Sequence, residues 1–283
     1  MNRFKSLLNK FQNIKLTDVK DIPNSELNTK SDLPPQPIIV HSSNWELKQM
    51  LSLAATGRFQ CYMNTASLLA ESELLSSLNI QTNPIAFIKN PLPFWFQENA
   101  RTLILPFQKK SDKLELLKQF EPFVELTGSR LVQENSQILF QELFMNATLD
   151  APREAKKLGI NPNKKGGQFI FAYDHEKFII SCLDPLGALD PLSMVQRIHH
   201  ILSKDNTSII NFDSKRGGAG IGCSLLFRYS STLSIVVEEG QGTRVSCTIP
   251  LKIGQKKFDL LEKNLQFIKI PSEGGQYEKQ RHA

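Results

Sequence analysis

The chain has 283 residues, which suffice for one large domain or two small ones. With 40% hydrophobic and 22% charged residues, the chain has a globular composition. Its formal net charge of +6 is modest, which fits a protein that binds anionic ligands but not a dedicated nucleic-acid binder. The four cysteines lack metal-ligand or redox spacing, no apolar run approaches the ~20 residues that span a bilayer, and the N-terminus lacks a signal-peptide core. These features predict a cytoplasmic protein with free, reduced thiols and no transmembrane segment.

Residues 1–36 are expected to hold a basic helix and a linker. Apolar residues between 3 and 15 recur at helical spacing, with lysines and an arginine at other positions. Such a helix can dock on a membrane surface or a partner, but a short one without a lipid anchor binds weakly, so packing on its own protein is favoured. The polar stretch 17–36 leads into prolines and is predicted to be a linker.

Residues 37–98 are predicted to form a small α/β module. The expected elements are strand 37–41, helix 45–55, strand 59–63, helix 66–78 and strand 84–88. The outline resembles a truncated receiver-type unit, but an acidic cluster and a phosphorylatable Asp are missing. A docking or dimerisation module is therefore expected, and a homodimer would fit it.

Residues 99–252 are predicted to form a second α/β domain, followed by a basic, partly disordered tail at 253–283. The expected elements are strand 101–107, helices 111–126 and 129–150, strands 167–173 and 177–183, helix 190–204, a glycine-rich turn at 217–222 that opens a helix to 229, and strands 232–239 and 243–251.

Three polar or glycine-rich stretches punctuate this second domain. Glu142 and Asn146 are four residues apart and share one face of a helix beside an apolar stripe. Alone, such a pair is usually a solvated edge. Asp184 ends an apolar strand and is followed by Pro-Leu-Gly, which alone is a common strand-to-turn pattern.

The third stretch is the glycine run 217–222, which precedes a helix. Glycine permits close approach of the backbone to a ligand, and the start of a helix directs free N–H groups at anions. A triphosphate is the natural guest of such a turn. Lys215 and Arg216 just upstream either add phosphate charge or form a solvated edge, and Thr243 follows in the second strand after the helix.

In order and spacing, these stretches resemble the GHKL ATPase superfamily over residues 100–252. The order strand–helix–helix before Asn146, and the run Asn146 to Ala151, resemble the anti-sigma-factor serine kinases in particular. The resemblance implies an α/β (α+β two-layer sandwich) fold, with a mixed sheet covered by helices on one face, and the cofactors ATP and Mg²⁺.

The resemblance also implies roles for individual residues. Asn146 would hold Mg²⁺ bridged to the phosphates, Glu142 would be the general base, and Asp184 would accept a hydrogen bond from the exocyclic amine of adenine. The remaining expected nucleotide-binding residues are Asp150, Gly187, Gly218, Gly220, Gly222 and Thr243. The turn departs from the family pattern D-x-G-x-G, because Leu186 and Ala188 stand where its glycines would be. Residues 190–216 would form the ATP lid, with its helix packed on the domain.

Three functions remain open within this family. The first is a Mg-ATP-dependent protein serine/threonine kinase or regulator in signal transduction, acting on a protein partner such as a component of a sigma-factor pathway and not directly on nucleic acid. The second is a nucleotide-gated switch with little catalysis. The third is the ATPase half of a split histidine kinase, because none of the five histidines lies in a phosphoacceptor helix upstream of the ATPase domain.

Overall fold

The computed structural model describes residues 15–21, 38–43, 46–65, 70–96, 99–162, 166–203 and 221–272. Of the basic helix expected at 3–15, only residue 15 lies within these ranges. Lys215, Arg216 and the glycines at 217–220 lie outside them.

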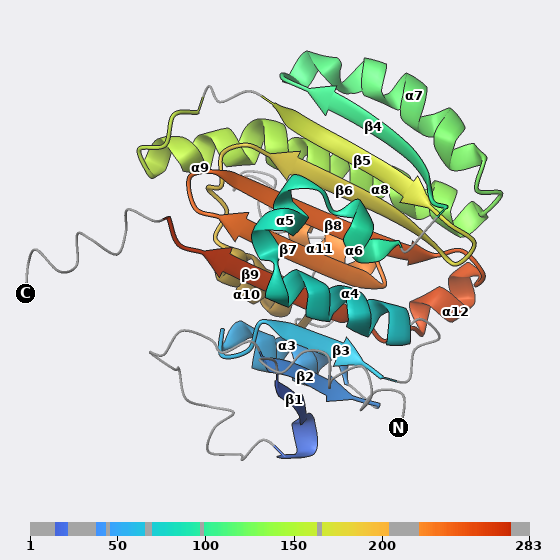
Figure 1. Ribbon diagram of the computed structural model, residues 1–283, viewed down its shortest axis with the longest axis vertical. Coiled ribbons are helices and arrows are strands. Elements are labelled where there is room, and N and C mark those ends of the chain that lie inside the picture. Colours follow the sequence, from blue (N-terminus) through green and yellow to red (C-terminus); the bar gives the residue numbers. More distant parts are fainter. Residues whose placement is uncertain are drawn as a thin grey trace, which may run out of the picture.

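A mixed nine-stranded sheet runs through the whole described chain, so the protein is of the α/β class (Figure 1). Its strands, in spatial order, are β1 (Lys15–Asp18), β2 (Ile38–Ser42), β3 (Cys61–Asn64), β9 (Asn264–Ile270), β7 (Thr232–Glu238), β8 (Gly242–Pro250), β6 (Lys177–Asp184), β5 (Gly167–Tyr173) and β4 (Arg101–Phe107). The pairs β1–β2, β2–β3 and β7–β9 are parallel, and the others are antiparallel.

Strand β9 connects the two predicted domains. It pairs antiparallel with β3 on one side and parallel with β7 on the other, so both halves of the chain share one sheet. The sequence had placed these residues in a partly disordered tail, and that prediction was wrong for 264–270. Strand β1 likewise lies in the stretch predicted as linker. Strand β1 has only four residues and is stabilised by pairing with β2, whereas the apolar residues of β9 were a usable signal.

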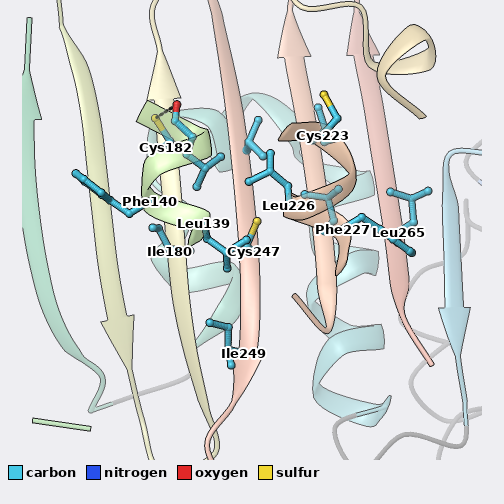
Figure 2. Packing of buried hydrophobic residues seen from close by; sticks show 14 of the residues in the cluster. Leu139, Phe140, Ile180, Cys182, Cys223, Leu226, Phe227, Cys247, Ile249 and Leu265 are labelled. Atoms are coloured by element: carbon cyan, nitrogen blue, oxygen red, sulfur yellow. Dashed lines mark hydrogen bonds between the residues drawn. The ribbon is translucent and has the colours of Figure 1, made fainter. Parts of the chain in front are cut away.

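One face of the sheet is covered by most of the helices. These are α3 (Leu47–Ala55), α7 (Lys113–Glu125), α8 (Arg130–Met145), α10 (Pro191–Ser203), α11 (Ile221–Arg228) and α12 (Gln255–Asp259). Phe120 and Phe140 stack with ring centroids 5.0 Å apart, and both pack on Phe171 of β5. Figure 2 shows the adjoining part of this layer, where Leu139 and Leu226 meet strand residues such as Cys247.

The opposite face is also covered, by α4 (Ala70–Thr82), α5 (Pro84–Lys89) and α6 (Leu92–Trp95) (Figure 1). The expectation of helices on one face was therefore too narrow. Residues 84–88, predicted as a strand, form α5 instead. The Asn83 side chain accepts a hydrogen bond from Ala86 N, and Pro84 occupies the first turn, where its missing N–H costs nothing.

Buried polar groups fasten these helices to the sheet. The carboxylate of Glu73 on α4, 1% exposed, accepts hydrogen bonds from Thr232 Oγ1 of β7 at 2.7 Å and from Asn264 Nδ2 of β9. The guanidinium of Arg244 on β8 donates from Nε and Nη2 to the carbonyl oxygen of Ile88 at the end of α5. Since buried polar groups are costly when unpaired, these bonds fix the position of α4 and α5 on the sheet.

Candidate functional site

A cavity opens between α8, α10 and the adjoining ends of β6 and β8. About 700 Å³ of empty space, open solvent included, lies within and in front of its lining. Its lining residues are Leu143, Asn146, Ala147, Asp150, Ala151, Arg153, Glu154, Cys182, Asp184, Leu189, Met194, Arg197, Cys223, Thr243 and Val245. Four residues that the sequence singled out, Asn146, Asp150, Asp184 and Thr243, thus meet in one place although they come from three different elements.

The end of α8 presents Asn146 and Asp150 to the cavity. Helix α8 starts at the cap Ser129, whose Oγ accepts from Val132 N at 3.4 Å, and continues past Met145 as a π-helical turn, Asn146–Asp150. A π turn widens the helix by one residue and is common at functional sites. Both side chains are partly buried and line the cavity, so their oxygen atoms are available as ligands there.

Asp184 is the last residue of β6 and is 6% exposed. Its Oδ1 accepts a hydrogen bond from Leu186 N at 2.8 Å, which holds the carboxylate at the bottom of the turn. Burial raises its pKa to about 6, against the lowering effect of this bond and of Thr243. A buried carboxylate with acceptor capacity left over can recognise an amine donor in a ligand.

Thr243 lies directly opposite Asp184 in the antiparallel pair of β6 and β8. Its hydroxyl is close enough to lower the pKa of the Asp184 carboxylate, but Oγ1 is buried and makes no well-formed hydrogen bond to the described part of the protein. Leaving such a group unpaired costs about 1–3 kcal/mol. A ligand or an ordered water in the cavity would satisfy it.

The turn after Asp184 is shaped by Gly187. Its φ is +61°, and a Cβ there would lie 2.1 Å from the carbonyl oxygen of Glu238. The Gly187 carbonyl oxygen accepts from Gly240 N at 3.1 Å, so the turn is tied to the hairpin between β7 and β8. Leu186 and Ala188, which stand where the pattern D-x-G-x-G has glycines, are buried and pack with Ala155 of α9 (Ala151–Lys157).

Glu142 lies one helical turn before Asn146, beside the cavity and not in its lining. Its carboxylate contacts Gly222 near the start of α11, where a Cβ would come within 2.1 Å of Oε2. Burial, and to a smaller degree the charge of Asp150, raises the pKa of Glu142, while Lys113 opposes the shift. The carboxylate is therefore a better proton acceptor near neutral pH than an exposed one.

Two arginines at the cavity were not anticipated from the sequence. Arg153 of α9 forms an ion pair with Asp150 at 2.8 Å and approaches Glu154 at 3.6 Å. Arg197 of α10 also lines the cavity. The pKa of Glu154 is lowered chiefly by its hydrogen bond from Lys157, with smaller contributions from the charges of Arg153 and Arg197. Burial raises the pKa of Cys223, and the charge of Arg197 opposes that rise. The spacing of Arg153 from Asp150, three residues along a helix, was a signal that could have been used.

Two cysteines also line the cavity, Cys182 of β6 and Cys223 of α11, and both are labelled in Figure 2. Burial raises the pKa of the Cys223 thiol to about 11 and that of Cys182 further. All four cysteines are free and buried, which confirms the prediction of unpaired thiols. Cys182 precedes Asp184 by two residues on the same strand and so shares its face, a relation that the sequence already contained.

The remaining predicted site residues fall into two groups. Gly187 and Gly222 border the site as described. Gly218 and Gly220 lie outside the described residues, and so does the part of the expected lid beyond Ser203. The helix predicted at 190–204 is present as α10, and it packs on the domain through Met194, Val195 and Ile198.

No family model matches the chain, and no characterised protein matches it at a significant level. Among the described residues no helix is long and apolar enough to cross a bilayer, and no group of three or more His, Cys, Asp or Glu side chains is placed to hold a metal ion.

Proposed function

We propose that the cavity binds an adenine nucleotide together with Mg²⁺, and that the protein is an ATP-dependent signal-transduction kinase or regulator that acts on a protein partner. The observation that carries the proposal is the convergence of Asn146, Asp150, Asp184 and Thr243 on one cavity. The resemblance to the GHKL ATPases assigns all four residues to one nucleotide site.

Base recognition would belong to Asp184 and Thr243. The Asp184 oxygen that is not bonded to Leu186 can accept from the exocyclic amine of adenine, whereas guanine presents a carbonyl oxygen there. The Thr243 hydroxyl, which makes no well-formed hydrogen bond to the described residues, offers a second polar contact directly across the strand pair. Leu143, Val245 and Met194 supply the apolar walls that a purine ring requires.

Phosphate and metal binding would belong to the other end of the site. Asn146 and Asp150 offer the oxygen ligands that Mg²⁺ prefers, and a site with few protein ligands is normal for an ion held largely by phosphates and water. When bound, Mg²⁺ would neutralise phosphate charge. Glu142, with its raised pKa, would accept the proton of an attacking hydroxyl.

A second candidate is a nucleotide-gated binding protein with little turnover. It is favoured by the position of Glu142, whose carboxylate lies against Gly222 beside the cavity instead of within its lining. A split histidine kinase, with the acceptor His on another chain, would use the same cavity and remains a third reading of it. A homodimer and a partner from a sigma-factor-type pathway are further parts of the proposal.

Titration calorimetry with Mg·ATP, Mg·GTP and adenosine tests nucleotide binding directly. We expect saturable binding of ATP and adenosine and at least tenfold weaker binding of GTP. No saturable binding at millimolar ATP would overturn the proposal. Phosphate release with and without Glu142→Ala then separates the two leading candidates, because only a kinase or ATPase loses activity in this variant.

A further inference from the structure

Helix α10 stands between the cavity and the N-terminal α/β part of the protein. One of its faces carries Met194 and Arg197, which line the cavity. Its other face carries Leu192, Gln196 and His199, which contact α3 and the turn after it. Positions 194 and 197 are about half a helical turn away from positions 192, 196 and 199, so one rigid helix serves both contacts.

The contacts between α10 and α3 are specific. Gln196 Nε2 donates to the carbonyl oxygen of Ala55 at 3.1 Å, and His199 Nε2 lies 3.1 Å from Ser52 Oγ. Leu192 packs on Gly57, where a Cβ would come within 2.8 Å of Leu192 Cδ2. A shift of α10 along or about its axis therefore has to be met by α3.

The N-terminal layer meets the rest of the sheet along a short strand pairing. Strand β3, which follows α3, is in register with β9 only through Cys61 and Tyr62. Strands β1 and β2 lie beyond β3, at the edge of the sheet (Figure 1). The α3 layer is therefore attached through α10, through the β3–β9 pairing with its flanking hydrogen bond from Asn64 N to Asn264 Oδ1, and through α4, which packs on β2 and β3 from the other face.

The face of α10 that lines the cavity carries a positive charge suited to binding phosphate. Arg197 lines the same cavity as Asn146, which would hold the phosphates through Mg²⁺. Its charge also opposes the rise in the pKa that burial causes at Cys223, near the start of α11. Arginine binds phosphate through short, charge-assisted and often bidentate hydrogen bonds.

We infer that α10 is a relay, that is, a helix that transmits a movement from the cavity to α3. Arg197 binds the phosphates of the bound nucleotide, and the resulting shift of α10 displaces α3 through Gln196, His199 and Leu192. The inference rests on the proposed nucleotide site and adds to it a regulated region, the N-terminal layer formed by β1, β2, β3 and α3. Nucleotide state would set the stability of that layer and hence what binds to it.

Hydrogen exchange of the full-length protein measures the relay. Exchange of the α3 amides at 47–55 is followed without ligand and with saturating Mg·ATP, Mg·ADP or adenosine, and calorimetry gives the affinities. We expect both phosphorylated ligands to slow exchange in α3 and adenosine, which lacks phosphates, to leave it unchanged. Arg197→Ala should weaken ATP binding at least tenfold and adenosine binding less than threefold.

Matched variants separate the contacts between α10 and α3 from nucleotide binding in the cavity. The double variant Ser52→Ala/Gln196→Ala removes polar contacts between α10 and α3, so it should bind ATP within about threefold of the parent but lose the α3 response. His200→Ala, an exposed position on the same helix, should keep it. An α3 response that survives in the double variant, or that adenosine also produces, overturns the relay. ATP binding without any α3 response overturns the relay alone, whereas absence of ATP binding overturns the nucleotide site and the relay together.

Discussion

The carboxylate of Glu142 lies directly against Gly222. The two residues are eighty positions apart in the chain and meet where α8 passes the start of α11. The contact leaves no room for a side chain at position 222. Glycine there allows the proposed base to stay beside the cavity, and the placement of Glu142 depends on it.

We predict that Gly222→Ala displaces Glu142 and lowers ATP turnover at least tenfold. The stability of the protein should change by less than about 1 kcal/mol, because the clash is with the end of a flexible side chain and alanine is favoured over glycine in a helix. Turnover assays and urea denaturation measure both effects. Gly254→Ala is the control, since a Cβ there meets no atom within 4 Å. Equal turnover in the parent and the Gly222 variant would show that Glu142 is not the base.

Asn146→Ala should weaken binding of Mg·ATP about tenfold or more. Asn146 is partly buried at the cavity rim, so its loss should cost the fold less than about 1 kcal/mol. Calorimetry with Mg·ATP, and with adenosine in the absence of metal as the control, checks the expectation. A loss of several kcal/mol in stability with unchanged ATP affinity would make Asn146 a structural residue.

The Asp184 carboxylate gives a pH dependence whose sign is fixed by burial. Its pKa is raised from 3.8 to about 6 in the folded protein, so between those values folding takes up a proton. Asp184 therefore lowers stability progressively as pH rises through this window, by about 3 kcal/mol in all, and by a constant amount above it.

Asp184→Asn removes this titration. The variant should gain stability relative to the parent as pH rises from 4 to 7, while its selectivity for ATP over GTP falls because an acceptor becomes a mixed donor and acceptor. Denaturation at both pH values and nucleotide titrations measure these effects. A stability difference that is the same at pH 4 and pH 7 would contradict the assignment.

Gly187→Ala should destabilise the protein by about 3 kcal/mol or more. Both the positive φ of +61° and a Cβ position 2.1 Å from the Glu238 carbonyl oxygen oppose any side chain there. Gly240→Ala is the matched control: its φ is +70°, but nothing lies within 4 Å of the added Cβ, so a cost of only about 1–2 kcal/mol is expected. Thermal and urea unfolding of the two variants should therefore differ clearly, and similar losses would show that the turn can move away from the hairpin.

The sequence alone determined the local elements of the site. The spacing of Glu142 and Asn146 placed them on one helix face, and the apolar run before Asp184 identified the end of β6. These features depend on periodicity within a segment, which a sequence displays directly. The element at 84–88 shows the limit of that signal, because a short apolar run fits a strand or a buried helix, and only the cap Asn83 and the following proline distinguish them.

Only the tertiary structure decided how distant segments combine. It placed β9 between β3 and β7, covered the second face of the sheet with α4 to α6, and brought Arg197 to the same cavity as Asp184. Strand order and cavity walls result from contacts between residues far apart in the chain, whose free energy comes from shared burial and pairing. No local pattern encodes that partnership, because the same strand or helix is stable beside any neighbour that buries its apolar face.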